Sequence, residues 1–447
     1  MKESDICVGL DIGTTSIKVI VAQQVDGQTN IIGVGNEVSA GVSRGIIVDI
    51  DKAAAAIKKT IAQAETKSSV EISRVIVGLP ADMISIDRCS GMISLDDNSQ
   101  EISDAEVVQV TQAAIASNIP PEREVIDLIP EEFKIDQFDG IPDPRGMVGS
   151  HLELKGRIIT GPKTLIHNVR KAVERAGLAI DLLLVSAEAE GRTILSDTEQ
   201  DFGTIIINLG GGQSTASVVH NHELKYVDVD HEGGQYITKD ISSVLNTSLK
   251  EAENIKREYG FADVEQASTE NQIPVEVVGQ SQPVKVSESL LAEIIQARLD
   301  QIFGRLKDKL QSANALELPG GLVLTGGVAA MQGIAELAAN TFGINVRIFV
   351  PDQMGLRHSS FATSLALVNY ANQLSEIERV MRTAFVTDQA TPSNNKTKLD
   401  YMEPSTRTAQ IKQPERSASL FSRRQSKGEP KKPKKSGSGF SLKNFFE

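Results

Sequence analysis

The sequence predicts an α/β fold in which helices cover largely parallel sheets and two halves of similar construction enclose a cleft. Short apolar runs that suit buried strands alternate with helical patterns along most of the chain. A unit of strand, glycine turn and strand occurs as LDIGTTSIKVIVA and again, about 200 residues later, as INLGGGQSTASVV. The length of 447 residues exceeds the roughly 250–300 at which single cores stop growing, so we expect at least two domains.

The predicted strands are short, apolar and mostly ended by Gly or Pro, as buried strands should be. They are ICVGLDIG, VIVGLP, LLLVSA, TIIINLGGG, GLVLTGG and VRIFV. Between them, Asp51 is expected to cap one helix and Thr164 another, each followed by apolar residues at helical spacing. A further helix is expected over AAMQGIAELAANTFG, after the last double-glycine turn.

Composition excludes several classes of protein. Cys7 and Cys89 are too few for a disulfide framework or a four-cysteine zinc site, which favours a reducing cytoplasm. The stretch MKESDICVGL has neither the basic nor the apolar region of a secretory signal. No apolar run approaches the roughly 18–20 residues that cross a bilayer. We therefore expect neither a secreted nor a membrane-spanning protein.

Charge divides the chain into an acidic body and a basic tail. Residues 411–447 contain ten of the 46 Lys and Arg residues and three of the 59 Asp and Glu residues, so this tail has a net charge of +7. The rest of the chain has a net charge of −20. From about Glu376 the helical periodicity fades into polar, Pro/Gly/Ser-rich sequence that cannot bury enough surface to fold. We expect about 60 residues of disordered linker with an end-to-end distance on the order of 40 Å.

The first glycine turn has the composition of a phosphate-binding loop. Asp11 ends a predicted buried strand, and Gly13 allows the backbone to approach a ligand closely. The consecutive N–H groups of Thr14, Thr15 and Ser16 can form an anion-binding concavity. An ordinary hairpin turn remains the alternative for this segment taken alone.

Three more glycine pairs complete the pattern. Gly211 and Gly212 lie between two strands, which excludes a Rossmann or Walker A loop because both of those open a helix. Gly326 and Gly327 end another strand, and Gly234 precedes a helical stretch. In the helix EAENIKREYG, Glu253 and Lys256 share one face at i, i+3. A solvated surface pair is usual for this spacing, but the four glycine turns taken together make that alternative less favoured here.

Two phosphate turns, a distal double-glycine turn and an E-x-x-K helix, in this order, resemble the ATP-binding superfamily of actin, heat-shock chaperones and sugar kinases. More specifically, the whole chain resembles the bacterial cell-division family FtsA. The resemblance is strongest in GMVGSHLELKGRIITGP and NVRKAVERAGL, and extends to EAENIKREYG and GGQYITKDIS. It implies an actin-like two-domain ATPase fold, with two mixed sheets around a nucleotide cleft and an extra subdomain special to the family.

The resemblance also implies the domain boundaries. They are 1–82 with 164–202 and 358–376 for subdomain 1A, 83–163 for the extra subdomain 1C, 203–232 with 286–357 for subdomain 2A, 233–285 for subdomain 2B, 377–438 for a disordered basic linker, and 439–447 for a membrane-targeting amphipathic helix.

Carried over to this chain, the family's ATP and Mg²⁺ site falls on the glycine turns. The resemblance places Gly13, Thr14 and Thr15 at the β/γ-phosphates with Gly211 and Gly212 opposite, Gly234, Glu253 and Lys256 near the ribose and adenine, Gly326 and Gly327 under the α-phosphate and adenosine, and Asp11 facing Mg²⁺ through water.

Two departures from the superfamily pattern argue against efficient hydrolysis. Asn208 stands where an Asp is usual in the second phosphate turn, and it supplies neither a negative charge nor a base. Ser186 occupies the position before the interdomain helix where relatives carry Glu or Gln. The sequence therefore predicts ATP binding with at most weak ATPase activity.

The tip GFSLKNFFE is expected to be an amphipathic helix on the membrane. Leu442, Phe445 and Phe446 fall within one arc of a helix, and Phe440 precedes it. So short a helix should form only on a surface that accepts its apolar face, and the basic residues before it would favour anionic lipid. Alternatives are a solubilising tail, a protein groove as the docking partner, and nucleic acid, which the acidic body disfavours.

The resemblance implies a polymerising adaptor that tethers FtsZ filaments to the cytoplasmic face of the membrane at the division septum. FtsZ would dock between about Gly233 and Lys285, later division proteins would be recruited through the extra subdomain, and no nucleic acid is expected. The alternatives are a small-molecule kinase of the same superfamily and a pilus-assembly adaptor related to FtsA.

Overall fold

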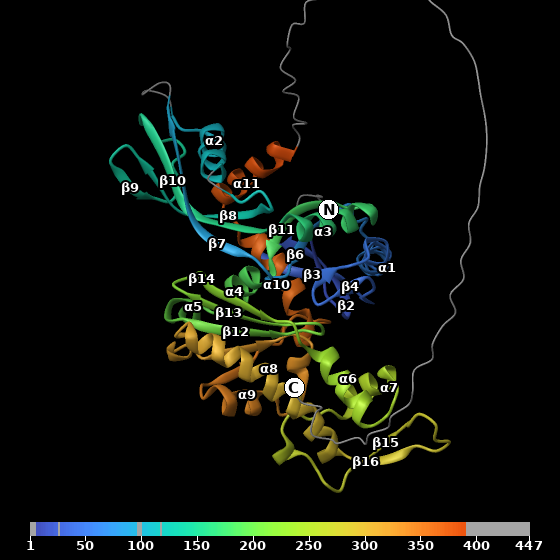
Figure 1. Ribbon diagram of the computed structural model, residues 1–447. Helices are drawn as coiled ribbons and strands as arrows, with labels where there is room; N and C mark the ends of the chain where they lie inside the picture. Colours follow the sequence, from blue (N-terminus) through green and yellow to red (C-terminus); the bar gives the residue numbers. More distant parts are fainter. Residues whose placement is uncertain (1–5, 26, 96–100, 117–118, 390–447) are drawn as a thin grey trace, which may run out of the picture. The chain divides into compact units, whose positions relative to one another are not determined.

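The computed structural model describes residues 6–25, 27–95, 101–116 and 119–389 (Figure 1). Two five-stranded mixed sheets and one four-stranded antiparallel sheet form the framework. This confirms the predicted α/β class.

The first sheet has the order β11-β6-β1-β2-β3. Its strands are β1 (Ile6–Ile12), β2 (Ser16–Val25), β3 (Gln28–Val38), β6 (Arg74–Leu79) and β11 (Ala179–Val185). Strands β1, β2 and β3 pair antiparallel, whereas β6 is parallel to both β1 and β11. The first glycine turn is the β1–β2 connection.

The second sheet repeats this plan with the order β14-β13-β12-β17-β18. Its strands are β12 (Thr204–Leu209), β13 (Ser214–His220), β14 (Glu223–Asp230), β17 (Leu322–Thr325) and β18 (Val346–Ile348). Here too an antiparallel hairpin, β12–β13, lies next to a parallel strand, β17. The internal repeat seen in the sequence therefore corresponds to two sheets of the same topology.

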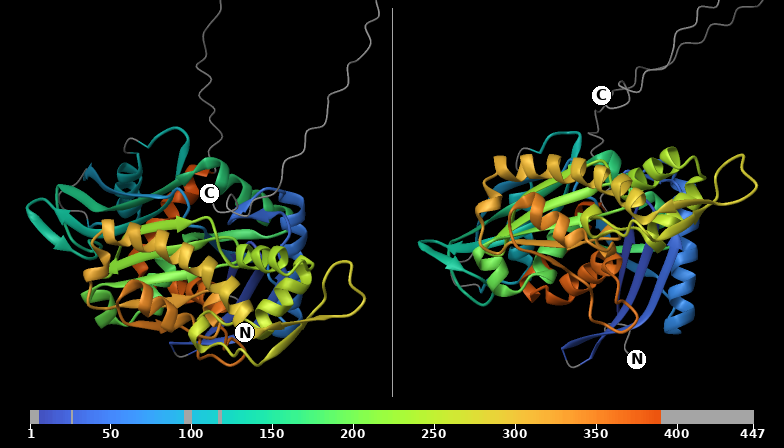
Figure 2. Two further views of the ribbon diagram at one scale, coloured as in Figure 1. Left: turned by 60° about the horizontal axis from the view of Figure 1, so that its bottom comes forward. Right: turned by 90° about the horizontal axis from the view of Figure 1, so that it is seen from below.

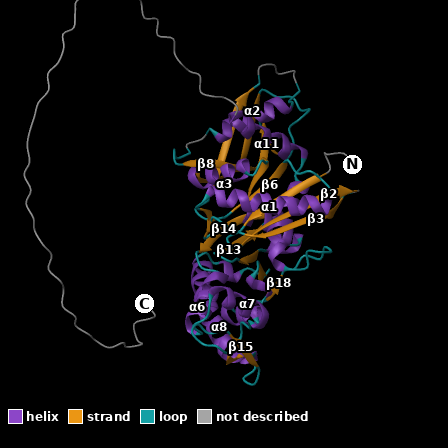
Figure 3. Ribbon diagram, turned by 90° about the vertical axis from the view of Figure 1, so that its right-hand side faces the viewer, coloured by secondary structure: helices purple, strands orange, loops and turns teal. Residues whose placement is uncertain are grey.

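Helices cover both sheets. They are α1 (Ile50–Ser68), α3 (Lys163–Arg175), α4 (Ser186–Ile194), α5 (Asp197–Phe202), α8 (Glu288–Ser312), α9 (Ile334–Phe342) and α10 (Ala362–Gln373). Helix α1 packs on β3, as the blue helix beside the blue strands in Figure 2 shows, and also on α3. Helix α10 packs on β1 and α4. Helix α4 also contacts β13 and β14, so it connects the two sheets. Figure 3 shows α1 and α3 on the flank of the first sheet.

Both predicted helix caps were wrong by two residues. Helix α1 is capped by Asp49, whose side chain accepts from the Lys52 N–H, and Asp51 lies in the first turn. Helix α3 follows Pro162 and has no side-chain cap. An acid in the first turn and proline just before it are both common at helix starts, so composition alone did not fix the capping residue.

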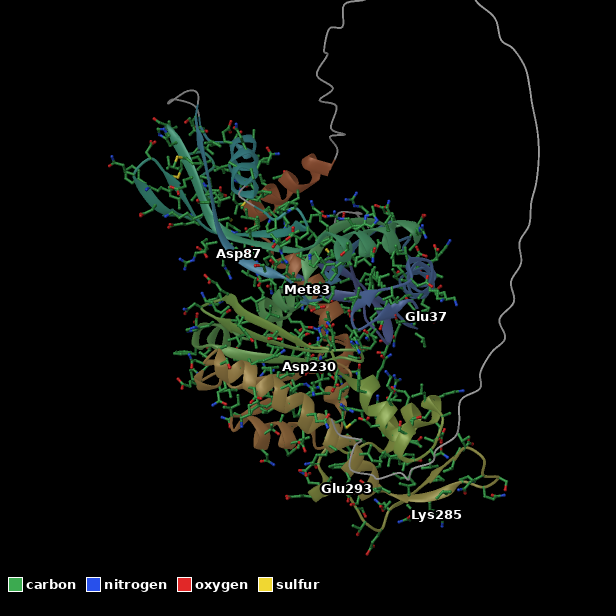
Figure 4. All side chains as sticks on the ribbon, in the orientation of Figure 1. Glu37, Met83, Asp87, Asp230, Lys285 and Glu293 are labelled. Carbon is green, nitrogen blue, oxygen red and sulfur yellow. The ribbon has the colours of Figure 1, made fainter. Side chains whose placement is uncertain are left out.

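The third sheet has the order β7-β10-β8-β9. Its strands are β7 (Ser85–Ser94), β8 (Arg123–Ile135), β9 (Phe138–Ile141) and β10 (His151–Pro162), and its helices are α2 (Asp104–Ile115) and α11 (Glu376–Gln389). Both helices pack on the sheet around a separate hydrophobic core that includes Phe133 and Met381. Met83, labelled in Figure 4, lies just before β7.

Helix α11 corrects the predicted start of the linker. Residues 376–389 are helical, although the sequence was interpreted as disordered from 377 onward. Ile377 and Met381 of this helix are buried against the third sheet. Its ion-paired Glu and Arg residues lowered the apparent hydrophobicity of a segment that tertiary packing nevertheless orders.

The remaining elements lie mainly beside the second sheet. They are β4 (Val42–Ser43), β5 (Ile46–Ile47), α6 (Gly234–Val244), α7 (Leu249–Tyr259), β15 (Gln272–Val275) and β16 (Val284–Ser287). The helix expected after Gly327 is split into a short 3₁₀ helix over Val328–Ala330 and α9, because Gly333 has a positive φ of 76°. Within the described residues, no helix is long and apolar enough to span a membrane.

Candidate functional site

The first glycine turn is a tight connection that requires glycine. Ile12 and Ile17 are the last pair of the β1–β2 hairpin, so Gly13, Thr14 and Thr15 form the turn. A Cβ added to Gly13 would lie 2.7 Å from the Ser16 carbonyl oxygen, which is too close for any other residue.

The second glycine turn is closed in the same way. The Gly210 N–H donates to the Gln213 carbonyl at 3.0 Å, and a Cβ on Gly210 would lie 2.8 Å from that oxygen. Helix α6 starts directly on this turn, because the Gly234 N–H donates to the Gly210 carbonyl at 2.9 Å and the Gln235 N–H to the Gly211 carbonyl at 2.8 Å.

The two turns meet face to face. A Cβ on Gly211 would lie 2.3 Å from Thr15 Cγ2, and one on Gly212 would lie 2.4 Å from Thr14 Oγ1. The structure thus brings together four of the residues that the sequence placed around the β/γ-phosphates. Because their atoms are in contact, a phosphate can enter between them only if the turns separate.

Asp11 lies at the end of β1 beside a buried lysine. Lys18 Nζ is 3.9 Å from Asp11 Oδ2 and donates to Ser16 Oγ at 2.7 Å. Burial raises the pKa of Asp11, and the Lys18 charge partly opposes this. A divalent cation would favour the ionised carboxylate. The donor set therefore fits a Mg²⁺ held beside phosphates largely through water.

Asn208 bonds to a buried glutamate that sequence reasoning missed. Asn208 Nδ2 lies 2.6 Å from Glu190 Oε1 and 3.1 Å from Thr363 Oγ1, and Thr363 donates to the same carboxylate oxygen at 2.5 Å. Glu190 is 2% exposed. The pKa of Glu190 is raised to about 7, mainly by burial. The two hydrogen bonds act to lower this pKa, and the charge of Asp11 acts to raise it.

The sequence did not indicate Glu190 as a site residue because it lies in α4, and a glutamate in a helix is usually an ordinary polar surface residue. The only available signal was its position in the helix that follows β11 and precedes the second phosphate turn. Ser186, the residue chosen for that role, begins α4, and its Oγ would lie 2.7 Å from a Cβ on Gly78 of β6. It therefore packs on the first sheet, while Glu190 bonds Asn208.

The Glu253–Lys256 pair is not a solvated surface pair. Lys256 is 8% exposed and donates to Glu253 Oε2 at 2.6 Å, to Thr238 Oγ1 at 2.8 Å and to the Gly234 carbonyl at 2.9 Å. Burial lowers the pKa of Lys256, although Glu253 opposes this. For Glu253 burial acts to raise the pKa, but Lys256 and the hydrogen bonds outweigh it and leave the pKa below its usual value.

The third glycine turn adjoins Asn208. Gly326 has a φ of 91°, and a Cβ there would lie 2.5 Å from Asn208 Oδ1. The Gly326 carbonyl accepts from Ser359 Oγ at 2.7 Å. Gly327 is more open, with Ser360 Cβ at 3.8 Å from the position of an added Cβ. The distal turn therefore lies beside the second phosphate turn, and open space remains above Gly327.

The four residues assigned to membrane binding lie outside the described residues. They are Phe440, Leu442, Phe445 and Phe446.

Two repeated sheets, with paired glycine turns facing each other, define an actin-like protein with a candidate nucleotide cleft. Among solved structures, the chain resembles a PilM–PilN type IV pilus biogenesis complex, with a TM-score of 0.57 and 17% identity over 82% of this chain and 99% of the other. It also resembles MreB5 of Spiroplasma citri bound to ADP, with a TM-score of 0.52 and 11% identity over 83% of this chain and 98% of the other. These likenesses confirm the actin-like fold.

Sequence comparison identifies the family. The model of cell division protein FtsA matches residues 205–366, and that of the SHS2 domain inserted in FtsA matches residues 82–160. The FtsA protein of Enterococcus hirae is 50% identical over 384 residues, covering 86% of this chain and 87% of the relative. The FtsA protein of Bacillus subtilis is 38% identical over 378 residues, covering 85% of this chain and 86% of the relative. The chain belongs to the FtsA family of cell-division proteins.

Proposed function

We propose that this protein is an ATP-binding, polymerising adaptor that tethers FtsZ filaments to the cytoplasmic face of the membrane at the division septum. By this proposal it also helps to recruit later division proteins through its third sheet. The observation that carries the proposal is the pair of glycine turns that meet across the cleft in a member of the FtsA family. The subdomain boundaries given above, with the linker moved beyond α11, are part of the same proposal.

ATP and Mg²⁺ are the ligands that suit the cleft. Backbone N–H groups at Thr14, Thr15 and Gly211 would bind the phosphates, and Asp11 would hold the hydrated cation. Near the base, Lys256 and Glu253 are fixed by their mutual hydrogen bond and are therefore preorganised for a ribose or purine. The test is calorimetric titration of Mg²⁺–ATP into the full chain. Absence of binding at millimolar ATP would overturn the proposal.

Turnover is proposed to be slow. Asn208 is engaged with Glu190 and Thr363 and brings no charge of its own. Glu190 Oε1 accepts from both Asn208 and Thr363, and the Glu190 side chain is 2% exposed, so this carboxylate is engaged within the protein and is not presented to an attacking water. Rapid single-turnover hydrolysis, on the order of the 1–100 s⁻¹ of kinases, would contradict this part of the proposal.

FtsZ is proposed to bind between Gly233 and Lys285, whose end is labelled in Figure 4. Val244, Leu249 and Val278 are 60%, 57% and 65% exposed in this region. Their segments adjoin, because the Val278 N–H donates to the Asn246 carbonyl at 2.9 Å in the α6–α7 connection. An apolar surface of this kind suits a short peptide tail.

Substitution of this surface tests the FtsZ assignment. The Val244→Asp/Leu249→Asp variant should lose binding to an FtsZ tail peptide and keep ATP affinity. The matched control is Val38→Asp/Val48→Asp, which alters two exposed apolar residues elsewhere. Equal peptide binding by both variants would refute the assignment.

Membrane attachment is proposed to use the tip from Phe440 to Phe446. One tip buries few side chains and binds weakly, so stable residence requires many tips on one polymer. A chain truncated after Gly439 should no longer sediment with anionic vesicles. If it sediments as well as the full chain does, the tip is not the anchor.

The small-molecule kinase is not favoured, because the family assignment covers both the body and the inserted SHS2 domain. A coupled assay with a panel of sugars and acids would reveal such an activity. The likeness to the pilus complex, at 17% identity, supports the fold alone.

A further inference from the structure

The β4–β5 hairpin lies at the outer edge of both phosphate turns. Its two strands, Val42–Ser43 and Ile46–Ile47, are joined by Arg44 and Gly45. The Gly45 N–H donates to Thr14 Oγ1 at 2.8 Å. A Cβ on Gly45 would lie 2.5 Å from Gln213 Oε1. Gly45, at the tip of this hairpin, therefore contacts Thr14 of the first phosphate turn and Gln213 of the second.

Arg44 links the two halves of the fold beside these contacts. Its Nη2 donates to the Tyr236 hydroxyl at 2.6 Å, and Tyr236 belongs to α6, which starts on the second phosphate turn. Among the residues that the structure describes, no carboxylate lies within ion-pair distance of Arg44. Its guanidinium is therefore held by a neutral phenol, a weaker partner than an anion would be.

Positive charge converges on the same phenol ring. The Arg44 guanidinium is 6.0 Å, the Lys239 ammonium 4.7 Å and the Arg298 guanidinium 5.7 Å from the Tyr236 ring centre. Among these three cations, only Arg298 forms ion pairs with carboxylates of the described part of the chain, namely those of Asp240 and Glu232. An anion that entered here would relieve the mutual repulsion of these cations.

The closed arrangement also carries local costs. Arg44 adopts a φ of 48°, a left-handed conformation that is unfavourable for a side chain with a Cβ. Gln213 Oε1 is buried against Gly45 without a hydrogen-bond partner among the described residues. Separation of the turns would relieve the unsatisfied acceptor, so the hairpin is poised to open.

We propose that the β4–β5 hairpin is a latch over the phosphate end of the cleft, and that Arg44 exchanges Tyr236 for the terminal phosphate of a bound nucleoside triphosphate. This inference rests on the proposed nucleotide-binding function and names the residue that would distinguish a triphosphate from a diphosphate. Phosphates between the turns would force Thr14 and Thr15 away from Gly212 and Gly211. The hairpin would follow Thr14 through Gly45, and Arg44 would then be free to form a charge-assisted hydrogen bond with the phosphate.

The test is calorimetric titration of ATP and ADP, each with Mg²⁺, into the full chain and its variants. Arg44→Ala removes both the closed-form bond to Tyr236 and the phosphate contact, so it should tighten ADP binding a few-fold and lower the ratio of ATP affinity to ADP affinity by about tenfold, as expected for one charge-assisted hydrogen bond. Tyr236→Phe removes the bond of the closed form and should tighten both nucleotides a few-fold. The control is Arg88→Ala, which removes an exposed arginine of β7 and should change neither affinity.

The outcomes separate the latch from the function on which it rests. If the unaltered chain binds neither nucleotide, the proposed function fails and the latch with it. If the chain binds both nucleotides but Arg44→Ala behaves like Arg88→Ala, or weakens ATP and ADP equally, the latch alone is refuted. Circular dichroism of each variant establishes that it is folded.

Discussion

Glu190 should make the stability of this protein fall as pH rises from about 4.5 to 7. Its carboxyl is 2% exposed, and burial raises its pKa to about 7 from a usual value of 4.5. The folded chain therefore retains a proton that the unfolded chain releases. Stability due to protonated Glu190 is fully present below pH 4.5 and is lost as pH rises through the folded pKa.

The magnitude follows from the shift. A difference of about 2.5 pKa units corresponds to roughly 3.4 kcal/mol at 1.36 kcal/mol per unit, as an upper value for one isolated group. Glu190→Gln keeps the shape and the acceptor for Asn208 and Thr363 but cannot ionise. We expect it to raise the free energy of unfolding at pH 8 by about 2–3 kcal/mol and to leave it nearly unchanged at pH 4.5.

The assay is urea unfolding of the full chain between pH 4.5 and 8, followed by circular dichroism. Glu71→Gln, at an exposed position before β6, is the matched control and should follow the unaltered chain. If Glu190→Gln has the same pH dependence as the control, Glu190 is ionised in the folded state and the account of its burial is wrong.

Three further outcomes are expected. Arg382→Met should lower the free energy of unfolding by about 3–5 kcal/mol, because it removes the ion-pair partner of Asp127, which is 3% exposed and lies 2.7 Å from Arg382 Nη2. Urea unfolding measures this change, and a loss below about 1 kcal/mol would contradict it. Lys256→Met should weaken ATP binding at least about tenfold by removing the partner of Glu253, and unchanged affinity by calorimetry would exclude Lys256 from the site. Gly304→Ala should stabilise the protein by about 0.5–1 kcal/mol, because Gly304 lies within α8 with no atom within 4 Å of an added Cβ; a lower thermal midpoint would refute that.

The sheet framework could be predicted because its strands are continuous apolar runs ended by glycine. Each run that was assigned became a strand: β1, β6, β12 and β17 lie inside the two sheets, and β11 and β18 lie at their edges. Both glycine turns connect antiparallel strands. The residues proposed to bind the phosphates came from the same pattern, since only glycine fits at Gly13 and Gly210.

The missed features depend on contacts between segments far apart in the chain. Glu190 became part of the site only because α4 packs against the end of β12. Helix α11 is ordered by Arg382 with Asp127 and by Arg192 with Glu378, pairs that join residues up to 255 positions apart. Sequence periodicity carries no information about such partners, so the charged amphipathic segment that forms α11 was interpreted as part of the disordered linker.

The hairpin over the phosphate turns was missed for a related reason. Its strands have two residues each, too few to show an alternating pattern. Arg44 looks like any exposed loop arginine until the second half of the molecule places Tyr236 beside it.

Vesicle co-sedimentation with and without ATP tests the central claim most directly, because it couples the nucleotide cleft to polymerisation and to the membrane. The full chain should sediment with anionic vesicles more completely when Mg²⁺–ATP is present, and Phe445→Glu/Phe446→Glu should stay in the supernatant under both conditions. Sedimentation that is independent of ATP and unaffected by the two substitutions would contradict the account.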